Sequence, residues 1–576
     1  MTIIKAIEIE NFRSIKKLKY FPSPGVNCIV GPGDSGKSSL LDAIDLCLGA
    51  KRSLQFSDSD FFNLDISNPI KITITLGNLD DGLKNIDTYG GHLHNFNQKS
   101  KLVSEEPQAG NETVLIAELL IKDDLEPQWR LLPNNDEAND STRYLSWSDR
   151  VRIAPTRLGT RSENNLNWNK NSILNKLSSE RADPSSILIQ AARDARTSYG
   201  ETAKNQLSET LKIVFDTANS LGISVGSEVK PLLDAFATFS TTGAVSLHDE
   251  HGIPLRQLGL GSARLLIAGL QKHLALSSSV ILVDELEYGL EPHRIIRLLG
   301  ALGSKDEPPL LQTFMTTHSP VAIRELSGDQ IFILRKKSNE HVLINTGVSD
   351  EFQGAIRKFP EALLSKALII CEGPSEIGLL RGLDNYYSSN EDRYIHLSAH
   401  GICLVDGKGD QMFDRALAFK SLGYETLVFK DKDKNLTPEK EEEFKNLGGS
   451  VISWRDARAL EDELFLCLSA SAIHELVELA VSIKGEAMIK EHIQSTSDGK
   501  ITLEIIRTQL LSGTLQEEAR VILGKASKNK RNGWFKTLRA MEYVADKIIG
   551  PDLINADQTF SQILRGIFKW SSDADA

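Results

Sequence analysis

Short apolar runs alternate with helix-compatible stretches along most of this chain, and the apolar runs end in polar residues. Six runs show this pattern, at residues 280–283, 313–316, 331–334, 368–371, 403–405 and 427–429. Buried strands separated by helices are typical of α/β proteins with parallel sheets. Functional residues in such sheets gather at the carboxyl ends of the strands. We therefore expect the functional residues of the chain at the positions where these runs end.

The first part of the chain predicts further strands and a helical insertion. Ile7 and Ile9 alternate with Glu8 and Glu10, which indicates an edge strand, and residues 70–76 alternate in the same way. Residues 77–145 are polar and predict strands joined by long loops. From about residue 156 to 237 the chain is rich in Ala, Leu, Lys and Ser, so this block is interpreted as a helical insertion.

The turn after apolar residues 28–30 has the spacing of a phosphate-binding loop. Its residues are Gly31, Pro32, Gly33, Asp34, Ser35, Gly36, Lys37, Ser38 and Ser39. Glycines let backbone N–H groups turn toward a phosphate at a helix N-terminus. Lys37 reaches the β- and γ-phosphate oxygens, and the Ser38 hydroxyl ligates Mg²⁺. The pattern predicts that the chain binds ATP with Mg²⁺.

Other strand ends and a second glycine turn complete an ATPase pattern. Asp284 and Glu285 end one strand, where one carboxylate can hold the water shell of Mg²⁺ and the other can polarise the attacking water. His318 follows another strand, and Gly261 and Ser262 open a helix suited to contact a γ-phosphate across a subunit interface. Taken singly, the two acids could be a solvated strand end and His318 a structural histidine. Their order and spacing relative to the P-loop favour the functional interpretation.

This order of motifs resembles the ATP-binding-cassette (ABC) ATPases, specifically the branch with RecF- and SMC-like heads. The resemblance rests on Asn11-Phe12-Arg13, the P-loop, a signature at residues 259–264, a Walker B strand ending in Asp284-Glu285, and His318. It implies that Glu285 is the catalytic base and that His318 senses the γ-phosphate.

Acidic residues mark the strand ends in the last part of the chain. Glu372 follows residues 368–371, Glu376 lies four positions on, and Asp431 and Asp433 follow residues 427–429. Glu461 is a candidate for an additional ligand. Such hard oxygen ligands, without cysteine or histidine, select Mg²⁺ or Mn²⁺ and suit metal-assisted phosphodiester hydrolysis. The alternatives are a solvated Asp-x-Asp loop and, for Glu461, a charged helix face.

The order Glu-Gly, Gly-x-Gly and Asp-x-Asp, each after an apolar strand, resembles the Toprim fold. An ATPase head of this branch followed by a Toprim domain resembles the OLD (overcoming lysogenization defect) family of nucleases over essentially the whole chain. The family implies DNA cleavage with Mg²⁺ or Mn²⁺, control by the ATPase head, and homodimers or higher homo-oligomers held through the helical insertion. It also implies anti-phage defence, alone or beside a partner protein or RNA. Its catalytic lysine maps to Lys530, with Lys536 as a rival and Lys528 still open.

The predicted fold class is therefore α/β: an ABC-type ATPase head with a helical insertion, then a Toprim-like parallel-sheet domain with a mainly helical C-terminal extension. For the 576 residues we expect four segments. Residues 1–155 and 241–350 are the two parts of the ATPase domain, residues 156–240 the insertion and residues 351–576 the nuclease domain with its extension.

Composition changes this picture little. A formal charge of −12 argues against broad nonspecific polyanion binding, although a local basic surface can still contact DNA. No apolar run is long enough to span a membrane and the N-terminus lacks the layout of a signal peptide, so we expect a cytoplasmic protein without a membrane partner.

A second function of another class remains open: a noncatalytic repair or chromosome clamp, in which the ATPase closes around DNA and the last domain is a scaffold. The acids at Glu372, Glu376, Asp431 and Asp433 favour the nuclease, because a scaffold has no need to concentrate like charges at strand ends.

Overall fold

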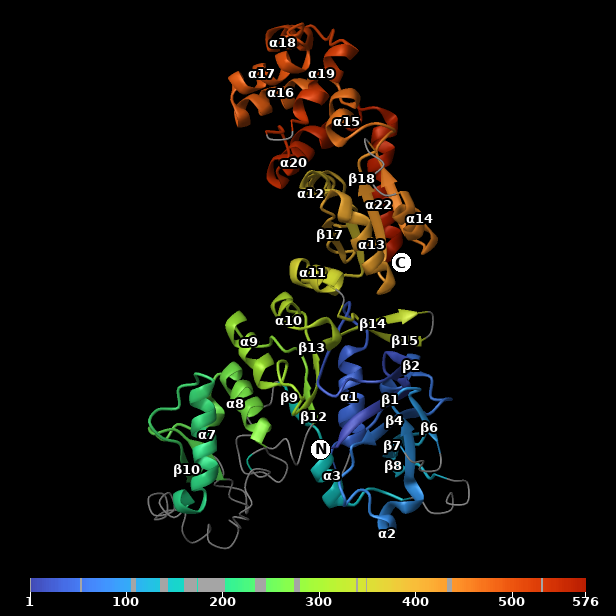
Figure 1. Cartoon of the computed structure of the whole chain (residues 1–576), viewed down its shortest axis with the longest axis vertical. Helices are drawn as coiled ribbons and strands as arrows, with labels where there is room; N and C mark the ends of the chain where they lie inside the picture. Colours follow the sequence, from blue (N-terminus) through green and yellow to red (C-terminus); the bar gives the residue numbers. More distant parts are fainter. Residues whose placement is uncertain are drawn as a thin grey trace. The chain divides into compact units, whose positions relative to one another are not determined.

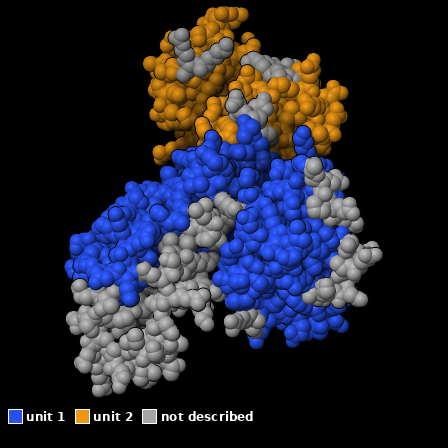
Figure 2. All heavy atoms as spheres, turned by 60° about the horizontal axis from the view of Figure 1, so that its bottom comes forward, with its two compact units in different colours: residues 1–349 blue, residues 350–576 orange. Residues whose placement is uncertain are grey.

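The chain forms two compact units in the computed structural model, Met1–Ser349 and Asp350–Ala576, which Figure 2 colours separately. The structure describes residues 2–51, 54–104, 110–134, 143–159, 174, 203–233, 245–273, 280–337, 340–348, 350–432, 438–529 and 532–575. Most of the expected helical insertion, together with Asp433 and Lys530, lies outside the described residues. None of the helices in the described ranges combines the length and the apolar character needed to cross a lipid bilayer.

The first unit is built on one large mixed sheet (Figure 1). Its strands are β1 (Ile3–Phe12), β2 (Ile15–Tyr20), β3 (Val26–Val30), β4 (Ile70–Gly77), β5 (Leu93–Asn97), β6 (Leu102–Ser104), β7 (Glu112–Ile121), β8 (Pro127–Leu131), β9 (Thr156–Leu158), β12 (Val280–Val283), β13 (Gln312–Thr316), β14 (Ile331–Lys337) and β15 (Glu340–Asn345). A separate hairpin joins β10 (Lys230–Leu233) to β11 (Val245–His248). The helices are α1 (Lys37–Leu48), α2 (Ile86–Tyr89), α3 (Trp147–Ile153), α7 (Ser208–Ser220), α8 (Leu260–His273), α9 (Pro292–Ala301) and α10 (Pro320–Glu325).

Parallel strands form the part of this sheet that carries the ATPase motifs. The order β14-β3-β13-β12-β9 is parallel throughout, so the ends of β3, β12 and β13 lie at one edge. All five residues of β3 are buried, because the strand is covered on both faces. Helix α1 begins directly after the turn that follows β3 and packs Leu40, Leu41 and Ile44 into the core.

Two features of the first unit differ from the expectations drawn from sequence. Strand β1 pairs with both β2 and β4 and is therefore not an edge strand, because alternation reports the two faces of a strand and not its neighbours. Thr156–Leu158, expected to begin the helical insertion, form strand β9 beside β12. Thr156 and Leu158 are buried on either side of Arg157, which is the alternation of a strand.

The second unit combines a small sheet with many helices (Figure 1). Its strands are β16 (Ala367–Cys371), β17 (Ile402–Asp406), β18 (Glu425–Lys430) and β19 (Ser450–Ser453). The helices are α11 (Asp350–Lys358), α12 (Pro374–Asn390), α13 (Met412–Ser421), α14 (Pro438–Asn446), α15 (Leu460–Cys467), α16 (Ala470–Lys484), α17 (Glu486–Thr496), α18 (Leu503–Leu511), α19 (Glu517–Ser527), α20 (Leu538–Val544), α21 (Gly550–Asp552) and α22 (Gln558–Asp575).

All strand pairs of this second sheet are parallel, in the order β17-β16-β18-β19, which confirms the predicted α/β class. One hydrophobic core joins the sheet to the helices that follow it in sequence. Helix α22 returns to pack on β16 and β19, where Trp454 stacks on Phe560 with ring centroids 5.4 Å apart. The carboxyl ends of β16, β17 and β18 therefore meet at one edge of the sheet.

Candidate functional site

The P-loop of the first unit adopts a conformation that only a glycine-rich turn allows. Gly31 and Gly36 have φ values of 154° and 95°, and a side chain on Gly31 would meet the Leu334 carbonyl oxygen at 2.8 Å. Gly33 and Asp34 are exposed at the tip of the turn. Because the turn leads directly into α1, backbone N–H groups at the start of this helix are available to an anion.

The polar side chains of the loop fit a nucleotide phosphate group. The Lys37 ammonium donates hydrogen bonds to the carbonyl oxygens of Gly31 at 3.0 Å and Pro32 at 2.7 Å, so it lies folded across the turn. Burial lowers the pKa of Lys37, opposed by nearby carboxylates. The Ser35 hydroxyl is buried without a hydrogen-bond partner among the described residues. In helix α1, the Ser39 hydroxyl lies 3.2 Å from the Ser14 hydroxyl. A buried ammonium and an unpaired hydroxyl are groups that a phosphate would satisfy.

Walker B residue Asp284 lies beside the P-loop. The Ser38 hydroxyl donates to its Oδ1 at 3.2 Å, and Thr316 at the end of β13 donates to the same oxygen at 2.6 Å. Ser38 and Asp284 are therefore placed together as the two protein groups that would hold Mg²⁺. Glu285 is exposed next to them, with a φ of 47°. This left-handed backbone costs a non-glycine residue energy and turns the carboxylate out of the strand direction.

Glu287 connects the Walker B turn to the switch histidine. Its carboxylate accepts a hydrogen bond from the Thr317 hydroxyl at 2.6 Å and from the His318 backbone N–H at 2.7 Å. The imidazole of His318 is exposed at the same edge of the sheet. The sequence analysis gave neither Thr316 nor Glu287 a role, although each lies two positions from a motif residue that it named.

The signature helix α8 packs on the Walker B turn of its own chain. Arg264 is fully buried and donates to the carbonyl oxygens of Glu285 at 3.1 Å and Tyr288 at 2.7 Å. Gly261 is buried where a side chain would meet the Gly289 carbonyl oxygen at 2.6 Å, and Ser262 accepts a hydrogen bond from Arg294 at 3.1 Å. Close packing in the same chain explains the glycine. A contact of Gly261 and Ser262 with the γ-phosphate of a second subunit stays a prediction.

Arg157 on β9 is a charged residue of the ATPase site that the sequence analysis missed. Its guanidinium forms ion pairs with Asp42 of α1, with Asp45 at 3.5 Å and with the Asp284 Oδ2 at 3.7 Å. It therefore links the P-loop helix to the Walker B carboxylate. The alternation of buried Thr156 and Leu158 around it is the signal that could have placed it in the sheet.

In the second unit, four acidic side chains gather at the carboxyl ends of β16 and β18 and at the start of two helices. The Asp431 backbone N–H donates to the Glu372 Oε2 at 2.9 Å, which brings two segments of the sequence together. Glu376 lies in the first turn of α12 and accepts a hydrogen bond from the Gly373 N–H at 2.9 Å. The Asp431 Oδ1 accepts from the N–H of Leu460, the residue before Glu461, at 3.0 Å.

The neighbouring carboxylates of this group raise one another's pKa values. Burial, together with the charges of Glu461 and Glu372, raises the pKa of Glu376 to about 8. Burial and the neighbouring carboxylates raise the pKa of Asp431 to about 9. Burial also raises the pKa of Glu461, while Lys536 and Lys528 oppose the shift. Carboxylates this close together are electrostatically unfavourable when they are ionised and no cation is bound.

These four acids lie near one another, but their side chains are not arranged as a set of metal ligands. Within the described part of the chain, no group of three or more His, Cys, Asp or Glu side chains is arranged to hold a metal ion. Glu372 and Glu376 instead accept backbone hydrogen bonds. Asp433, the fifth acid expected here, lies outside the described residues.

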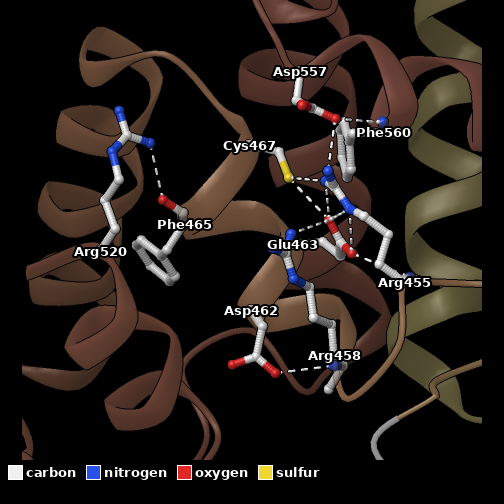
Figure 3. A network of polar contacts seen from close by, with 10 residues as sticks. Arg455, Arg458, Asp462, Glu463, Phe465, Cys467, Arg520, Asp557 and Phe560 are labelled. Carbon is white, nitrogen blue, oxygen red and sulfur yellow. Dashed lines mark hydrogen bonds and ion pairs between the residues drawn. The ribbon is translucent and has the colours of Figure 1, made fainter. Parts of the chain in front are cut away.

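An ion-pair network supports the loop that leads from β19 into α15, the helix of Glu461 (Figure 3). Arg455, just after β19, donates to both oxygens of the fully buried Glu463 and forms an ion pair with Asp557 at 2.9 Å. Arg458 approaches Glu463 at 3.4 Å from the same loop, and its carbonyl oxygen accepts from the Lys432 N–H at 3.0 Å. The network thereby fixes the loop that closes over Asp431.

Two of the three candidate lysines lie near the acids. Lys528 donates to Asp462, next to Glu461, at 2.6 Å. The Lys536 ammonium donates to the Lys528 carbonyl oxygen at 3.2 Å and is exposed. Lys530 lies outside the described residues. The lysine-rich stretch thus places positive charge beside Glu461.

Comparison with known proteins identifies the first unit. Residues 26–324, just over half of the chain, match the family described as AAA domain, putative AbiEii toxin, Type IV TA system. An OLD nuclease from Thermus scotoductus is 23% identical over 381 residues, which cover 60% of this chain and 64% of that relative, under two thirds of its length. An ATP/GTP phosphatase from Helicobacter pylori is 24% identical over 373 residues, 59% of this chain and 90% of that protein.

Among solved structures, the SMC head domain of Pyrococcus furiosus bound to the C-terminal domain of ScpA covers 60% of this chain and 96% of its own, with 14% identity and a TM-score of 0.36. The predicted resemblance to the OLD nucleases and to RecF- and SMC-like ATPases is confirmed. The chain belongs to the AAA-domain family described as putative AbiEii toxin of type IV toxin–antitoxin systems, and its first unit is an ATPase domain of the RecF, SMC and OLD type.

Proposed function

We propose that the chain is an ATP-hydrolysing DNA endonuclease, in which the acids of the second unit cleave phosphodiester bonds with Mg²⁺ or Mn²⁺. The observation that carries the proposal is the gathering of Glu372, Glu376, Asp431 and Glu461, joined by the hydrogen bond from Asp431 to Glu372. Their mutual repulsion is what a divalent cation would relieve. Similarity to an OLD nuclease supports the same activity.

The donor set fits hard divalent cations, because it consists of carboxylates. Glu372 and Asp431 would hold them at the strand ends, with Glu376, Glu461 and Asp433 as further ligands. A bound cation supplies a Lewis acid and an activated water. For this to happen, the buried acids must ionise.

The remaining groups of the second unit would act on the scissile phosphate. An ammonium beside Glu461 can neutralise charge that develops on the phosphate. Lys536 is the better placed of the two described lysines, because Lys528 is held by Asp462 and the Lys536 ammonium is exposed. Lys530 stays a candidate on sequence grounds.

In the ATPase unit, Lys37 and Ser38 would bind the nucleotide phosphates and Mg²⁺, with Asp284 as the second protein group. Glu285 would polarise the attacking water and His318 would contact the γ-phosphate. We further propose that the chain forms a homodimer or higher homo-oligomer, that nucleotide controls cleavage, and that it serves anti-phage defence, alone or beside a partner protein or RNA.

The test is a plasmid assay with the purified chain in Mg²⁺ or Mn²⁺, with and without ATP. Three variants run alongside: Glu372→Ala, Lys37→Ala, and Glu443→Gln as a control at an exposed acid of α14. We expect the parent and Glu443→Gln to cut and Glu372→Ala to be inactive. Cutting by Glu372→Ala at the parent rate would refute the site. ATP hydrolysis and DNA binding without any cutting would favour the noncatalytic clamp.

A further inference from the structure

A group of cations lies beside the acids of the second unit, at the carboxyl end of β17. The turn Gly407-Lys408-Gly409 follows this strand. Backbone hydrogen bonds join it to the end of β16 and to Glu372, the next residue. The Gly407 N–H donates to the Cys371 carbonyl oxygen at 2.6 Å, and the Gly409 N–H donates to the Glu372 carbonyl oxygen at 2.9 Å. Lys408 therefore sits one turn away from the first of the acids.

Lys408 has an uncommon backbone conformation. Its φ of 54° is left-handed, which is uncommon for a residue with a side chain. The Asp406 carboxylate accepts a hydrogen bond from the Lys408 N–H at 2.9 Å and stabilises this turn. A side chain at Gly407 would meet the Cys371 carbonyl oxygen at 2.6 Å, so the turn is pressed against β16.

Two more cations approach Lys408 from other elements. The Arg415 guanidinium, from the first turn of α13, donates to the Asp406 carbonyl oxygen and lies 5.2 Å from the centre of the Phe359 ring. Helix α11 packs on α13. Lys358, next to Phe359 at the end of α11, is exposed and lies close enough to Lys408 for the two positive charges to repel each other.

Nearby carboxylates do not fully offset the positive charge of these three side chains. The pKa of Lys358 is lowered chiefly by contact with Lys408, and Arg415 adds to the effect. Of the groups that shift this pKa most, only Asp406 opposes them. Other lysines of this unit form ion pairs with carboxylates, for example Lys440 with Asp414 at 2.5 Å and Lys445 with Glu441 at 2.6 Å. Adjacent ammonium groups that repel each other are stabilised by an anion between them.

We propose that Lys358, Lys408 and Arg415 form a phosphate-contact surface that holds the backbone of a DNA strand beside Glu372. The inference deepens the proposed function and rests on it for the identity of the nucleic acid. Cations at one strand end and acids at the next would let a phosphodiester chain pass from binding to cleavage along a single edge of the sheet. Such contacts position the backbone without reading its sequence.

The experiment measures binding, so that it does not depend on cleavage. The full-length chain, in EDTA, is titrated against labelled single-stranded DNA, duplex DNA and RNA of the same sequence at several salt concentrations, with fluorescence anisotropy as the readout. The test variant combines Lys358→Gln with Lys408→Gln. The control combines Lys445→Gln with Lys490→Gln. It removes the same net charge from one exposed and one partly exposed lysine that carboxylates already hold.

We expect the test variant to bind DNA at least several-fold more weakly than the parent, and its salt dependence, as log K against log salt, to flatten by about 2 for two lost phosphate contacts. The control should keep the parent affinity and slope. Thermal unfolding of both variants at the parent temperature would show that the fold is intact.

Equal DNA binding by the parent and the test variant would overturn the inference, as would equal weakening in both double variants. Binding of RNA but not DNA by the parent would also overturn it, because the partner would be wrong. Weakened DNA binding together with a chain that cuts no DNA in metal would uphold the surface and refute the proposed cleavage, so the two failures are distinguishable.

Discussion

Glu463 has a carboxylate that is fully buried and held by Arg455 (Figure 3). A buried charge that loses its partner is strongly destabilising, because its desolvation is no longer offset. We predict that Arg455→Met lowers the free energy of unfolding by about 3 kcal/mol. Denaturant unfolding followed by circular dichroism measures this.

Arg458→Met is the matched control for this prediction. Arg458 approaches the same carboxylate at 3.4 Å, but Arg455 would still hold it in this variant. The loss should therefore be smaller than for Arg455→Met. Equal losses in the two variants would show that the network does not depend on Arg455.

Among the elements, α12 and α20 lie in close contact through two glycines spaced one helical turn apart. A side chain at Gly378 would meet the Leu538 carbonyl oxygen at 2.5 Å, and one at Gly382 would meet the Glu542 carbonyl oxygen at 2.2 Å. We predict that Gly382→Ala destabilises the chain by about 1–3 kcal/mol, because backbone atoms cannot move aside as a side chain does. Thermal or denaturant unfolding gives the value.

A second helical glycine provides the comparison. Gly566 in α22 has only the Ile452 side chain nearby, at 3.9 Å, so Gly566→Ala meets no obstacle. That variant should be neutral or more stable by up to about 1 kcal/mol, since alanine favours a helix. A destabilisation of Gly566→Ala as large as that of Gly382→Ala would show that helix packing is not the cause.

An ion pair joins helices α16 and α18, and its contribution to stability depends on pH. Arg507 donates to both oxygens of Glu478, at 2.7 and 2.9 Å, and thereby lowers the pKa of this carboxyl. A lowered pKa gives stability that is present above the ordinary value and is lost as the pH falls through the folded value. Because the pair is partly exposed, Glu478→Gln should cost at most about 1 kcal/mol at neutral pH.

The cost of Glu478→Gln should vanish in acid, where the parent carboxyl is protonated as well. Unfolding curves of parent and variant across the acidic range test this. In the Arg507→Gln background the substitution should have no effect at any pH. A cost that persists at low pH would assign it to packing.

For the whole molecule, the two sites lie in separate compact units, so they can be disabled separately. Lys37→Ala removes the ammonium that lies across the P-loop. We predict loss of ATP binding and hydrolysis with an unchanged melting temperature for the nucleotide-free chain. Phosphate release and binding of a fluorescent ATP analogue measure it. ATP turnover at the parent rate would contradict the P-loop assignment.

A feature of the molecule could be predicted from the sequence when the pattern that indicates it is local. Strands such as β12 and β16 were identified because they are short, apolar and buried on both faces. The P-loop and Asp284 were found because their chemistry depends on local spacing. The meeting of Glu372 with Asp431 was expected because parallel strands end at one edge.

Long-range pairing was harder to predict. The position of β1 inside the sheet depends on which strands lie beside it, and alternation in β1 carries no such information. Arg157 and Lys408 gain their surroundings from segments far away in sequence, from α1 in one case and α11 in the other. A short strand or a single lysine in a glycine turn does not reveal these partners.

If Glu372 and Asp431 hold one divalent cation together, Mn²⁺ binding to the nucleotide-free chain depends on both carboxylates. Electron paramagnetic resonance of free Mn²⁺ would be recorded for the parent, Glu372→Gln, Asp431→Asn, Lys37→Ala and Glu443→Gln. We predict that Mn²⁺ binding is lost in the first two variants and retained in the last two. Parent-like Mn²⁺ binding by both Glu372→Gln and Asp431→Asn would show that the two carboxylates do not share a cation.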